Sequence, residues 1–342
     1  MSTPHPHDGA WVEPMREAVR LSLNPDVFRS ANPRVGCVIV ATDGSIVGRG
    51  WHRGAGTDHA EVMALSEAGN RARGATAVVT LEPCAHTGRT GPCAVALIDA
   101  GITRVVFAVA DPFPPAAGGA ALLRAAGIDV IEGVLADDAR YANRAWTHVR
   151  IQGRPLVTVK MAVSLDGRVA DASGGPTAIT GRQARAHAHV QRALVDAIVV
   201  GTGTALADDP HLTARMPDGE LAPRQPLRVV MGTSDIPAQA RVRDDEAPTV
   251  LVRSRDPREL MSILTSHDVQ HVLVEGGPTF AAALLEAELV DELSWYISPV
   301  LLCDGPLSLP ALDHPIQVTT RRVELLGEDV YVEGVVDVHR DR

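Results

Sequence analysis

Apolar positions along this chain recur with two different periods, and the two alternate from one segment to the next. Short apolar runs in the first half predict strands, and apolar residues three or four positions apart predict helices. The expected strands are 35–41, 45–51, 76–82, 104–109 and 129–134, and the expected helices are 12–23, 59–69, 93–100, 119–126 and 136–147. Such alternation is typical of an α/β fold with helices packed on a sheet.

The second half continues the alternation and closes on strands. We expect strands at 155–163, 196–201, 227–231, 249–253, 271–275, 292–302, 320–326 and 329–337, and helices at 182–195, 257–266 and 279–287. The turn Gly327-Glu328-Asp329 predicts an antiparallel hairpin at the edge of a mainly parallel sheet. A chain of 342 residues can hold two cores, so we predict domains at 1–149 and 154–342, joined by a linker at 150–155.

Composition excludes several classes of protein. No apolar run reaches the roughly 18–20 residues that cross a membrane, and the first ten residues lack the basic and apolar stretches of a secretory signal. Four cysteines do not suggest a disulfide framework. We therefore expect a cytoplasmic protein without a membrane partner.

Charge argues against a nucleic-acid partner. The net charge is −10, and residues 1–150 contain 14 arginines against 15 acidic residues, a net of −1. Residues 151–342 contain 18 basic and 27 acidic residues, a net of −9. Neither half has the broad basic surface that phosphate backbones require, although a small basic pocket for one phosphate remains compatible with these numbers.

The strongest chemical signal is a set of three metal-binding residue types. His59, Cys84 and Cys93 offer one imidazole and two thiolates, and catalytic zinc sites use three protein ligands and leave a fourth position for water. Glu61 follows the histidine by two residues, where it can move protons to and from that water. The set resembles the signature of zinc-dependent deaminases. A structural zinc, with Cys37 or His86 as fourth ligand, and a chance match are the alternatives.

Two further features lie in the second half. Lys160 is the only lysine among 32 basic residues, which suggests a site that needs a compact ammonium, although drift would also explain it. Glycine-rich segments follow predicted strands at 201–204 and 275–279. In the second, Pro278 suits a first helical turn whose free N–H groups bind an anion such as a dinucleotide phosphate. A plain strand–helix turn is the alternative.

Several motifs in one order make the whole chain resemble the bifunctional deaminase/reductase family of riboflavin biosynthesis. In the first half these are Asn32-Pro33-Arg34-Val35-Gly36-Cys37, Gly50-Trp51-His52, His59-Ala60-Glu61 and the segment from Glu82 to Cys93. In the second half they are the segments Lys160 to Arg168, Ile179 to Gly181, Val200 to Pro210 and Val274 to Thr279.

The resemblance implies two consecutive reactions on one phosphorylated aminopyrimidine. A cytidine-deaminase-like α/β/α domain would use Zn²⁺ to remove the 2-amino group, and a dihydrofolate-reductase-like α/β domain would use NADPH to reduce the ribosyl group to a ribityl chain. It also implies a homo-oligomer, a dimer or tetramer. By match to the family's motifs, Asn32, His52, His86 and Arg89 would bind the substrate of the first site.

The same resemblance implies residue roles in the second half, where Lys160 would be catalytic. Ser164, Arg192, Leu212, Arg215 and Glu275 would bind the substrate, and Val163, Thr180, Thr204, Asp208, Thr233, Gly277, Pro278 and Thr279 would bind NADPH. Two residues depart from the family pattern. Ala178 replaces a tryptophan, and Phe113 replaces an asparagine.

Three rival functions remain at this point. The chain could be a deaminase whose second half only binds nucleotide or mediates assembly. It could be an RNA-editing deaminase, which its charge and the eight residues between Cys84 and Cys93 disfavour. It could also be a reductase with a structural zinc domain.

Overall fold

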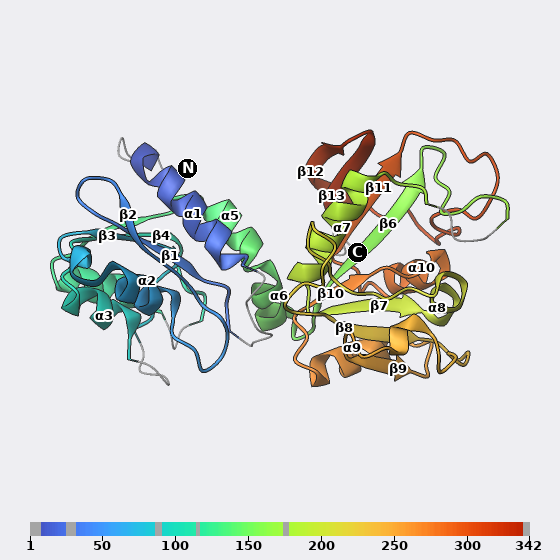
Figure 1. Cartoon of the computed structure of the whole chain (residues 1–342), viewed down its shortest axis with the longest axis horizontal. Helices are drawn as coiled ribbons and strands as arrows, with labels where there is room; N and C mark the ends of the chain where they lie inside the picture. Colours follow the sequence, from blue (N-terminus) through green and yellow to red (C-terminus); the bar gives the residue numbers. More distant parts are fainter. Residues whose placement is uncertain (1–7, 25–31, 86–90, 114–116, 174–177, 338–342) are drawn as a thin grey trace. The chain divides into compact units, whose positions relative to one another are not determined.

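The computed structural model describes residues 8–24, 32–85, 91–113, 117–173 and 178–337. The chain divides into two compact units, Met1–Thr147 and His148–Arg342, each with its own sheet (Figure 1). Among the described residues, no helix combines the length and the apolar character that spanning a membrane requires.

The first unit is a five-stranded sheet covered by helices on both faces (Figure 1). Its strands run in the spatial order β2-β1-β3-β4-β5, with β1 antiparallel to β2 and β3, and β3, β4 and β5 parallel. The strands are β1 Gly36–Val40, β2 Ile46–Trp51, β3 Thr76–Leu81, β4 Arg104–Val109 and β5 Asp129–Glu132. The helices are η1 Asp8–Trp11, α1 Val12–Ser22, α2 Ala60–Ala68, η2 Gly69–Ala72, α3 Cys93–Asp99, α4 Gly119–Ala125 and α5 Ala136–Ala142, and α6 Arg144–Gln152 spans the boundary to the second unit.

Strand alternation builds two cores in this unit. Cys37 and Ile39 of β1 face α2, α3 and α4, whereas Val38 and Val40 face α1 and α5. Glycines let α2 lie directly on β2, because a Cβ at Gly50 would approach the Ala60 carbonyl oxygen to 2.1 Å. The close contact fixes the start of α2, where His59 and Glu61 lie.

The second unit is an eight-stranded mixed sheet in the spatial order β12-β13-β11-β6-β10-β7-β8-β9. The strands are β6 Leu156–Ser164, β7 Ala197–Gly201, β8 Leu227–Met231, β9 Thr249–Val252, β10 His271–Val274, β11 Glu292–Ser298, β12 Val318–Leu326 and β13 Asp329–Val336. The helices are α7 Arg182–Leu194, α8 Thr202–Asp208, η3 Arg241–Arg243, α9 Pro257–Ser266 and α10 Pro278–Glu286. Of these strands only β13 runs opposite to the others, so it pairs antiparallel with both β11 and β12, and the β12–β13 pair confirms the predicted hairpin edge.

Helices cover both faces of this sheet as well. Val157, Val159 and Val163 of β6 pack with α9 and α10, and the intervening positions of β6 point to the face that carries α7. Strands β6, β7, β8 and β10 are parallel, so their carboxyl ends meet along one edge. Ligands of open α/β sheets bind at such an edge.

Most predicted elements are confirmed to within a few residues, and three predictions are wrong. The single helix expected at 136–147 is two helices, and Asn143 lies between them as the C-cap residue of α5. Its side chain accepts a hydrogen bond from the Arg34 N–H at 2.7 Å and donates one to the Arg34 carbonyl at 2.8 Å. The linker was expected to begin at residue 150, but α6 continues to Gln152. The strand expected at 292–302 ends at Ser298. Helix α8 was not predicted at all.

Candidate active sites

Three donor atoms in the first unit lie close enough together to bind one metal ion. His59 Nδ1 lies 3.1 Å from Cys93 Sγ and 3.7 Å from Cys84 Sγ. In a tetrahedral site with Zn–N of about 2.1 Å and Zn–S of about 2.3 Å, donor atoms lie about 3.6 Å apart. The three ligand atoms all lie within 4.8 Å of one another, so the residues fit one zinc ion.

The charge state of the two thiols also favours a cation. The pKa of Cys84 is lowered to about 4, because Cys93 and His59 hydrogen-bond its thiolate. The pKa of Cys93 is raised by that neighbouring thiolate and by burial. Two buried thiols this close cannot both ionise without a compensating positive charge, and zinc would supply that charge.

Local contacts fix the loop that carries Cys84. The buried carboxylate of Glu82 accepts hydrogen bonds from the backbone N–H groups of Asp111 at 3.2 Å, Gly118 at 3.2 Å and Ala120 at 2.9 Å. A Cβ at Gly119 would lie 1.7 Å from the Pro83 carbonyl oxygen, so only glycine allows α4 to press on this loop. Cys84 is thereby held just past the end of β3, as the sequence predicts.

Glu61 lies beside these donors in the first turn of α2 and is 4% exposed. Burial raises the pKa of its carboxyl group to about 7. A carboxyl group with that pKa can both accept and donate a proton near neutral pH, which general acid–base catalysis requires.

Asn32 and His52 form a second pair near the metal ligands. The Asn32 amide nitrogen lies 3.0 Å from His52 Nε2, and His52 Nδ1 lies 3.2 Å from the Asp58 carbonyl oxygen. Because the Asn32 amide N–H donates, His52 Nε2 accepts, and the His52 proton is therefore on Nδ1. Burial lowers the pKa of His52. His52 contacts His59 edge to face, with ring centroids 5.2 Å apart. His86 and Arg89 lie outside the described residues.

Cys37 is not part of this group. Its side chain is fully buried in β1, and the described residues that share the site are His59, Cys84 and Cys93. The alternative in which Cys37 supplies a fourth zinc ligand is therefore wrong. Within the described part of the chain the site has three protein donors, which is the number that catalytic zinc sites use.

The second unit contains a buried ionic cluster around Glu275, just after β10. Arg192 of α7 binds its carboxylate through two nitrogens, Nε at 2.6 Å and Nη2 at 2.8 Å. Lys160 Nζ of β6 lies 3.6 Å from Glu275 Oε2 and 5.7 Å from the ring centre of Tyr296. Burial alone would raise the pKa of Glu275, but Arg192 and Lys160 outweigh it and lower the pKa to about 2. The cluster thus has one carboxylate and two cations.

The residues expected to bind NADPH lie on or follow elements at the carboxyl edge of the parallel strands. Thr204 lies in α8 after β7 and approaches Gly277, where a Cβ would lie 3.4 Å from the threonine hydroxyl. Gly277 caps α10, with Pro278 and Thr279 in its first turn. Thr233 follows β8, Val163 is buried near the end of β6, Asp208 ends α8, and Thr180 precedes α7.

The other three residues expected to bind the reductase substrate, Ser164, Leu212 and Arg215, each contact other parts of the protein. The Ser164 hydroxyl donates to Asp166 at 2.6 Å and accepts from the Arg168 N–H at 2.9 Å, so it is engaged in a turn. Leu212 is buried with a φ of +52°, and its side chain packs in the core. Arg215 pairs with Glu246 at 3.4 Å.

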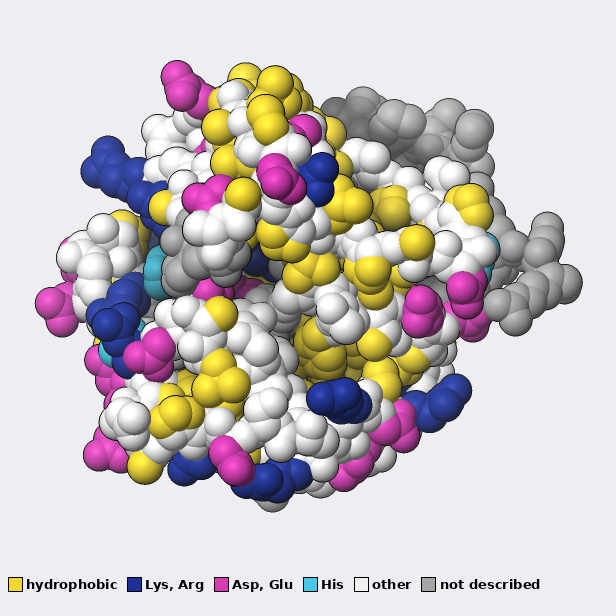
Figure 2. Space-filling view, turned by 90° about the vertical axis from the view of Figure 1, so that its right-hand side faces the viewer, with side chains coloured by type: hydrophobic (Ala, Val, Ile, Leu, Met, Phe, Trp, Pro, Cys, Tyr) yellow, Lys and Arg dark blue, Asp and Glu magenta, His cyan; other side chains and the backbone are white. Residues whose placement is uncertain are grey.

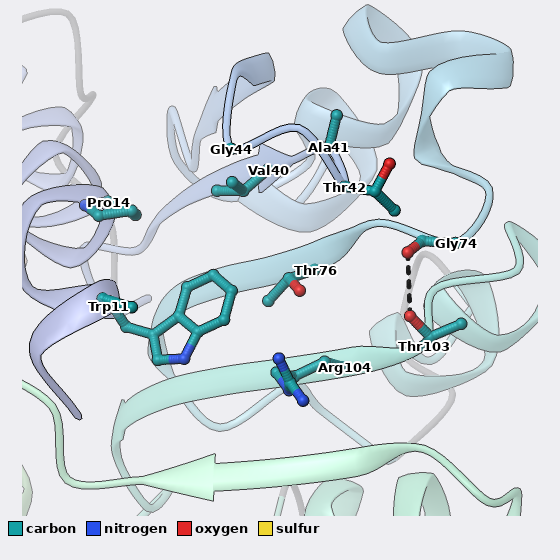
Figure 3. Close-up of a pocket in the computed structure, with 11 residues that line it drawn as sticks. Trp11, Pro14, Val40, Ala41, Thr42, Gly44, Gly74, Thr76, Thr103 and Arg104 are labelled. Carbon is teal, nitrogen blue, oxygen red and sulfur yellow. Dashed lines mark hydrogen bonds between the residues drawn. The ribbon is translucent and has the colours of Figure 1, made fainter. Parts of the chain in front are cut away.

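Two cavities are distinct from both clusters. A pocket of about 570 Å³ is lined by Ala178, Thr180 and the β12–β13 turn. A pocket of about 480 Å³ lies among Trp11, Val40, Thr76 and Arg104 (Figure 3). It adjoins the start of β3, whereas Cys84 follows its end, so the strand's length of about 20 Å separates this pocket from the metal ligands.

Comparisons with known proteins support this pairing of sites. The family model "Cytidine and deoxycytidylate deaminase zinc-binding region" matches residues 12–109, and "RibD C-terminal domain" matches residues 155–332. The riboflavin biosynthesis protein RibD of Mycobacterium tuberculosis is 52% identical over 81% of each chain. That of Escherichia coli is 40% identical over 92% of this chain and 96% of its own.

The chain belongs to the RibD family. A crystal form of Acinetobacter baumannii RibD matches it with a TM-score of 0.80 and 33% identity, covering 96% of this chain and 99% of its own. A diaminohydroxyphosphoribosylaminopyrimidine deaminase/5-amino-6-(5-phosphoribosylamino)uracil reductase of Thermotoga maritima matches with a TM-score of 0.82, 31% identity and the same coverage. RibD proteins are bifunctional enzymes of riboflavin biosynthesis, and this one has a zinc-binding deaminase domain and a reductase domain. The predicted fold class and enzyme class are confirmed.

Two residues expected to differ from the RibD family pattern, Phe113 and Ala178, lie in described parts of the structure. Phe113 is 40% exposed, and its N–H bonds the Asp111 carboxylate at 2.8 Å, so the loop keeps a turn without the asparagine. Ala178 lines the 570 Å³ pocket, where a tryptophan would fill part of the space.

Sequence reasoning missed residues that complete the RibD reductase cluster. His189 lies three residues before Arg192 on α7, and its pKa is lowered by burial and by the charge of Arg192. Tyr296 lies beneath Lys160 and is 1% exposed. Helical spacing from Arg192 could have identified His189, because residues three apart share a helix face.

One face of this RibD chain is drawn in Figure 2. The coloured basic and acidic side chains there are interspersed around hydrophobic ones, and a hollow opens near the middle of the view.

Proposed function

We propose that this enzyme deaminates 2,5-diamino-6-ribosylamino-4(3H)-pyrimidinone 5′-phosphate with the help of zinc and then reduces the product's ribosyl group with NADPH. The observation that carries the first step is the convergence of His59, Cys84 and Cys93 beside the buried carboxyl group of Glu61. The solved Thermotoga maritima relative is named as both a deaminase and a reductase, and the match covers 99% of that chain.

In the first step water replaces the 2-amino group. The His59 imidazole and the two thiolates would hold zinc, which when bound supplies Lewis-acid activation of water near neutral pH. Glu61 would take a proton from the attacking water, and the same proton would pass to the departing amino group, which leaves as ammonia. The carbon–nitrogen bond breaks as a carbon–oxygen bond forms, and no electrons are transferred.

Asn32 and His52 would orient the pyrimidine in that step. His52 holds its proton on Nδ1, and the Asn32 amide has a carbonyl oxygen as well as the N–H that faces His52. The His52 ring contacts that of His59 with centroids 5.2 Å apart, and Asn32 bonds His52, which supports a role for the pair beside the metal ligands. Their role is to select the ring, and the proton transfer belongs to Glu61.

In the second step the sugar's C1′ gains a hydride and its open-chain form gains a proton. NADPH would supply the hydride when bound at the strand ends described above. Lys160 would supply the proton to the sugar oxygen or imine nitrogen, because its ammonium lies in the same cluster as the expected substrate residues. Arg192 uses three of its five N–H donors within the described residues, which leaves two for the substrate's phosphate.

Two properties of the whole protein complete the proposal. The exposed side chains of Val323 and Leu325 on the edge strand β12 favour a homo-oligomer, a dimer or tetramer. None of the four cysteines forms a disulfide, which fits a reducing cytoplasm.

A two-signal assay tests the proposed function. With the diaminopyrimidine ribotide as substrate, we expect ammonia release without NADPH, and oxidation of one NADPH per ammonia when the cofactor is added. Ammonia is measured by a coupled enzyme and NADPH by absorbance. Ammonia release without any NADPH oxidation would show that the chain is a deaminase whose second domain only binds nucleotide or mediates assembly. NADPH oxidation only with pre-deaminated substrate would leave a reductase with a structural metal site.

A further inference from the structure

Arg228 of β8 is a charged residue in an unusual place, because its side chain is 0% exposed. A buried cation is costly unless it is paired and fully hydrogen-bonded. The guanidinium donates to Asp244 Oδ1 at 2.7 Å, the His211 carbonyl at 3.2 Å and the Thr249 hydroxyl at 2.8 Å. It also donates to the carbonyls of Arg241, Asp244 and Ala247. It therefore joins the loop after α8 to the loop before β9.

The contacts continue outward from Asp244 to the surface. The same carboxylate accepts from the Glu246 N–H at 3.0 Å and pairs through its other oxygen with His211 Nδ1 at 3.0 Å. The Glu246 carboxylate lies 3.3 Å from His211 Nδ1 and 3.4 Å from Arg215 Nη2. A continuous chain of contacts thus runs from buried Arg228 through Asp244 and Glu246 to the guanidinium of Arg215.

These carboxylates are better explained as a relay than as a metal site. His211, Asp244 and Glu246 do place one ligand atom each within 4.8 Å of the others. However, Arg228 and Arg215 already neutralise the two carboxylates, so a divalent cation would face two guanidinium groups. The balance of two cations and two anions favours a fixed ion-pair network.

The segment that this network holds is the one that carries Arg215. Leu212 has a left-handed φ of +52°, a backbone conformation that is strained for a residue with a side chain. Two arginines fix its flanks, Arg228 at the His211 carbonyl and Arg192 at the Thr213 carbonyl, at 3.2 and 3.1 Å. Arg192 also binds Glu275, so this backbone is tied to the reductase cluster.

We propose that Arg228 is a positioning residue of the reductase, which holds the Arg215 guanidinium through Asp244 and Glu246 and thereby makes the enzyme select substrates that carry a phosphate. The inference rests on the proposed function, and it adds that Arg215, one of the residues expected to bind the substrate, contacts the substrate's phosphate in addition to Arg192. Arg228 itself touches no substrate, because its side chain is buried. A phosphate that binds Arg215 in a preset position gains affinity, since the side chain loses little freedom on binding.

The experiment compares NADPH oxidation on the deaminated pyrimidine ribotide and on the same compound without its phosphate. We expect wild type to prefer the ribotide, and Arg215→Ala to lose that preference. Glu246→Gln should reduce the ratio of the two kcat/KM values roughly fivefold, mainly through KM for the ribotide. Arg228→Lys should reduce it on the order of tenfold, because lysine cannot make the forked contacts. Glu220→Gln, an exposed change in the same region, should leave the ratio unchanged.

The outcomes separate the inference from the function on which it rests. If wild type and Arg215→Ala treat both compounds alike, the phosphate role in the proposed function is wrong. If Arg215→Ala loses the preference but Glu246→Gln and Arg228→Lys keep it, the relay is overturned while the function stands. Equal losses on both compounds would also overturn it, because a purely structural role lowers turnover without changing selectivity.

Discussion

Glu61→Gln is expected to lower ammonia release by a factor of about 10²–10⁴, the usual contribution of a positioned general acid–base group. Glutamine keeps the size of the side chain and its place in the first turn of α2, but it cannot accept and return a proton. The metal ligands are unchanged, so zinc content should stay at the wild-type level. NADPH oxidation on pre-deaminated substrate should also be unchanged, because Glu61 lies in the other unit. Coupled ammonia detection and elemental analysis measure the two effects.

The matched control for this change is Glu67→Gln on the same helix. Glu67 is exposed, and its carboxylate accepts from the Arg49 N–H at 2.9 Å. The Glu67→Gln substitution removes the same charge from α2 outside the metal site, so this variant should retain ammonia release. A Glu61→Gln enzyme that deaminates at the wild-type rate would show that another group moves the proton.

Lys160→Met is expected to slow NADPH oxidation by a factor of roughly 10²–10³ while ammonia release continues at the wild-type rate. Methionine retains much of the apolar stem but removes the ammonium that lies 3.6 Å from Glu275 and 5.7 Å from the Tyr296 ring centre. The proposed proton donor is lost, and among the described residues Arg192 remains as the cationic partner of Glu275. Single-turnover NADPH oxidation on pre-deaminated substrate measures the chemical step.

Lys160→Arg tests whether charge alone is sufficient. Arginine keeps the positive charge beside Glu275, but its guanidinium does not give up a proton near neutral pH. If proton donation is the role, Lys160→Arg should be nearly as slow as Lys160→Met. Full activity of either variant would show that Lys160 has no catalytic role and that its survival as the only lysine is drift.

The metal-binding group could be predicted from the sequence because each ligand is marked by local features. Pro83 ends a strand just before Cys84, and His59 and Cys93 stand at the starts of helices. These local features placed all three correctly at element ends. The depth of Glu61 was not predictable, because it depends on how closely α2 lies on the glycines of β2.

The reductase cluster shows where sequence reasoning ended. Lys160 was distinctive as the only lysine, and strand alternation could assign its face, but no pattern paired it with Glu275 across neighbouring strands. Helix α8 was missed because Gly203 and two threonines are poor helix formers. Tertiary packing of Ala205 in the core overrides that preference. The burial of Arg228 could not be predicted either, because an arginine in a short strand is expected to be exposed.

The most direct test of the whole account is zinc measured by elemental analysis in the purified chain and in Cys84→Ser and Cys93→Ser, with ammonia release followed on the same samples. We predict one zinc per chain in the wild type, and loss of both zinc and ammonia release in each variant. NADPH oxidation on pre-deaminated substrate should persist in both. Wild-type protein that releases ammonia at full rate without zinc, or variants that keep both metal and activity, would contradict the account.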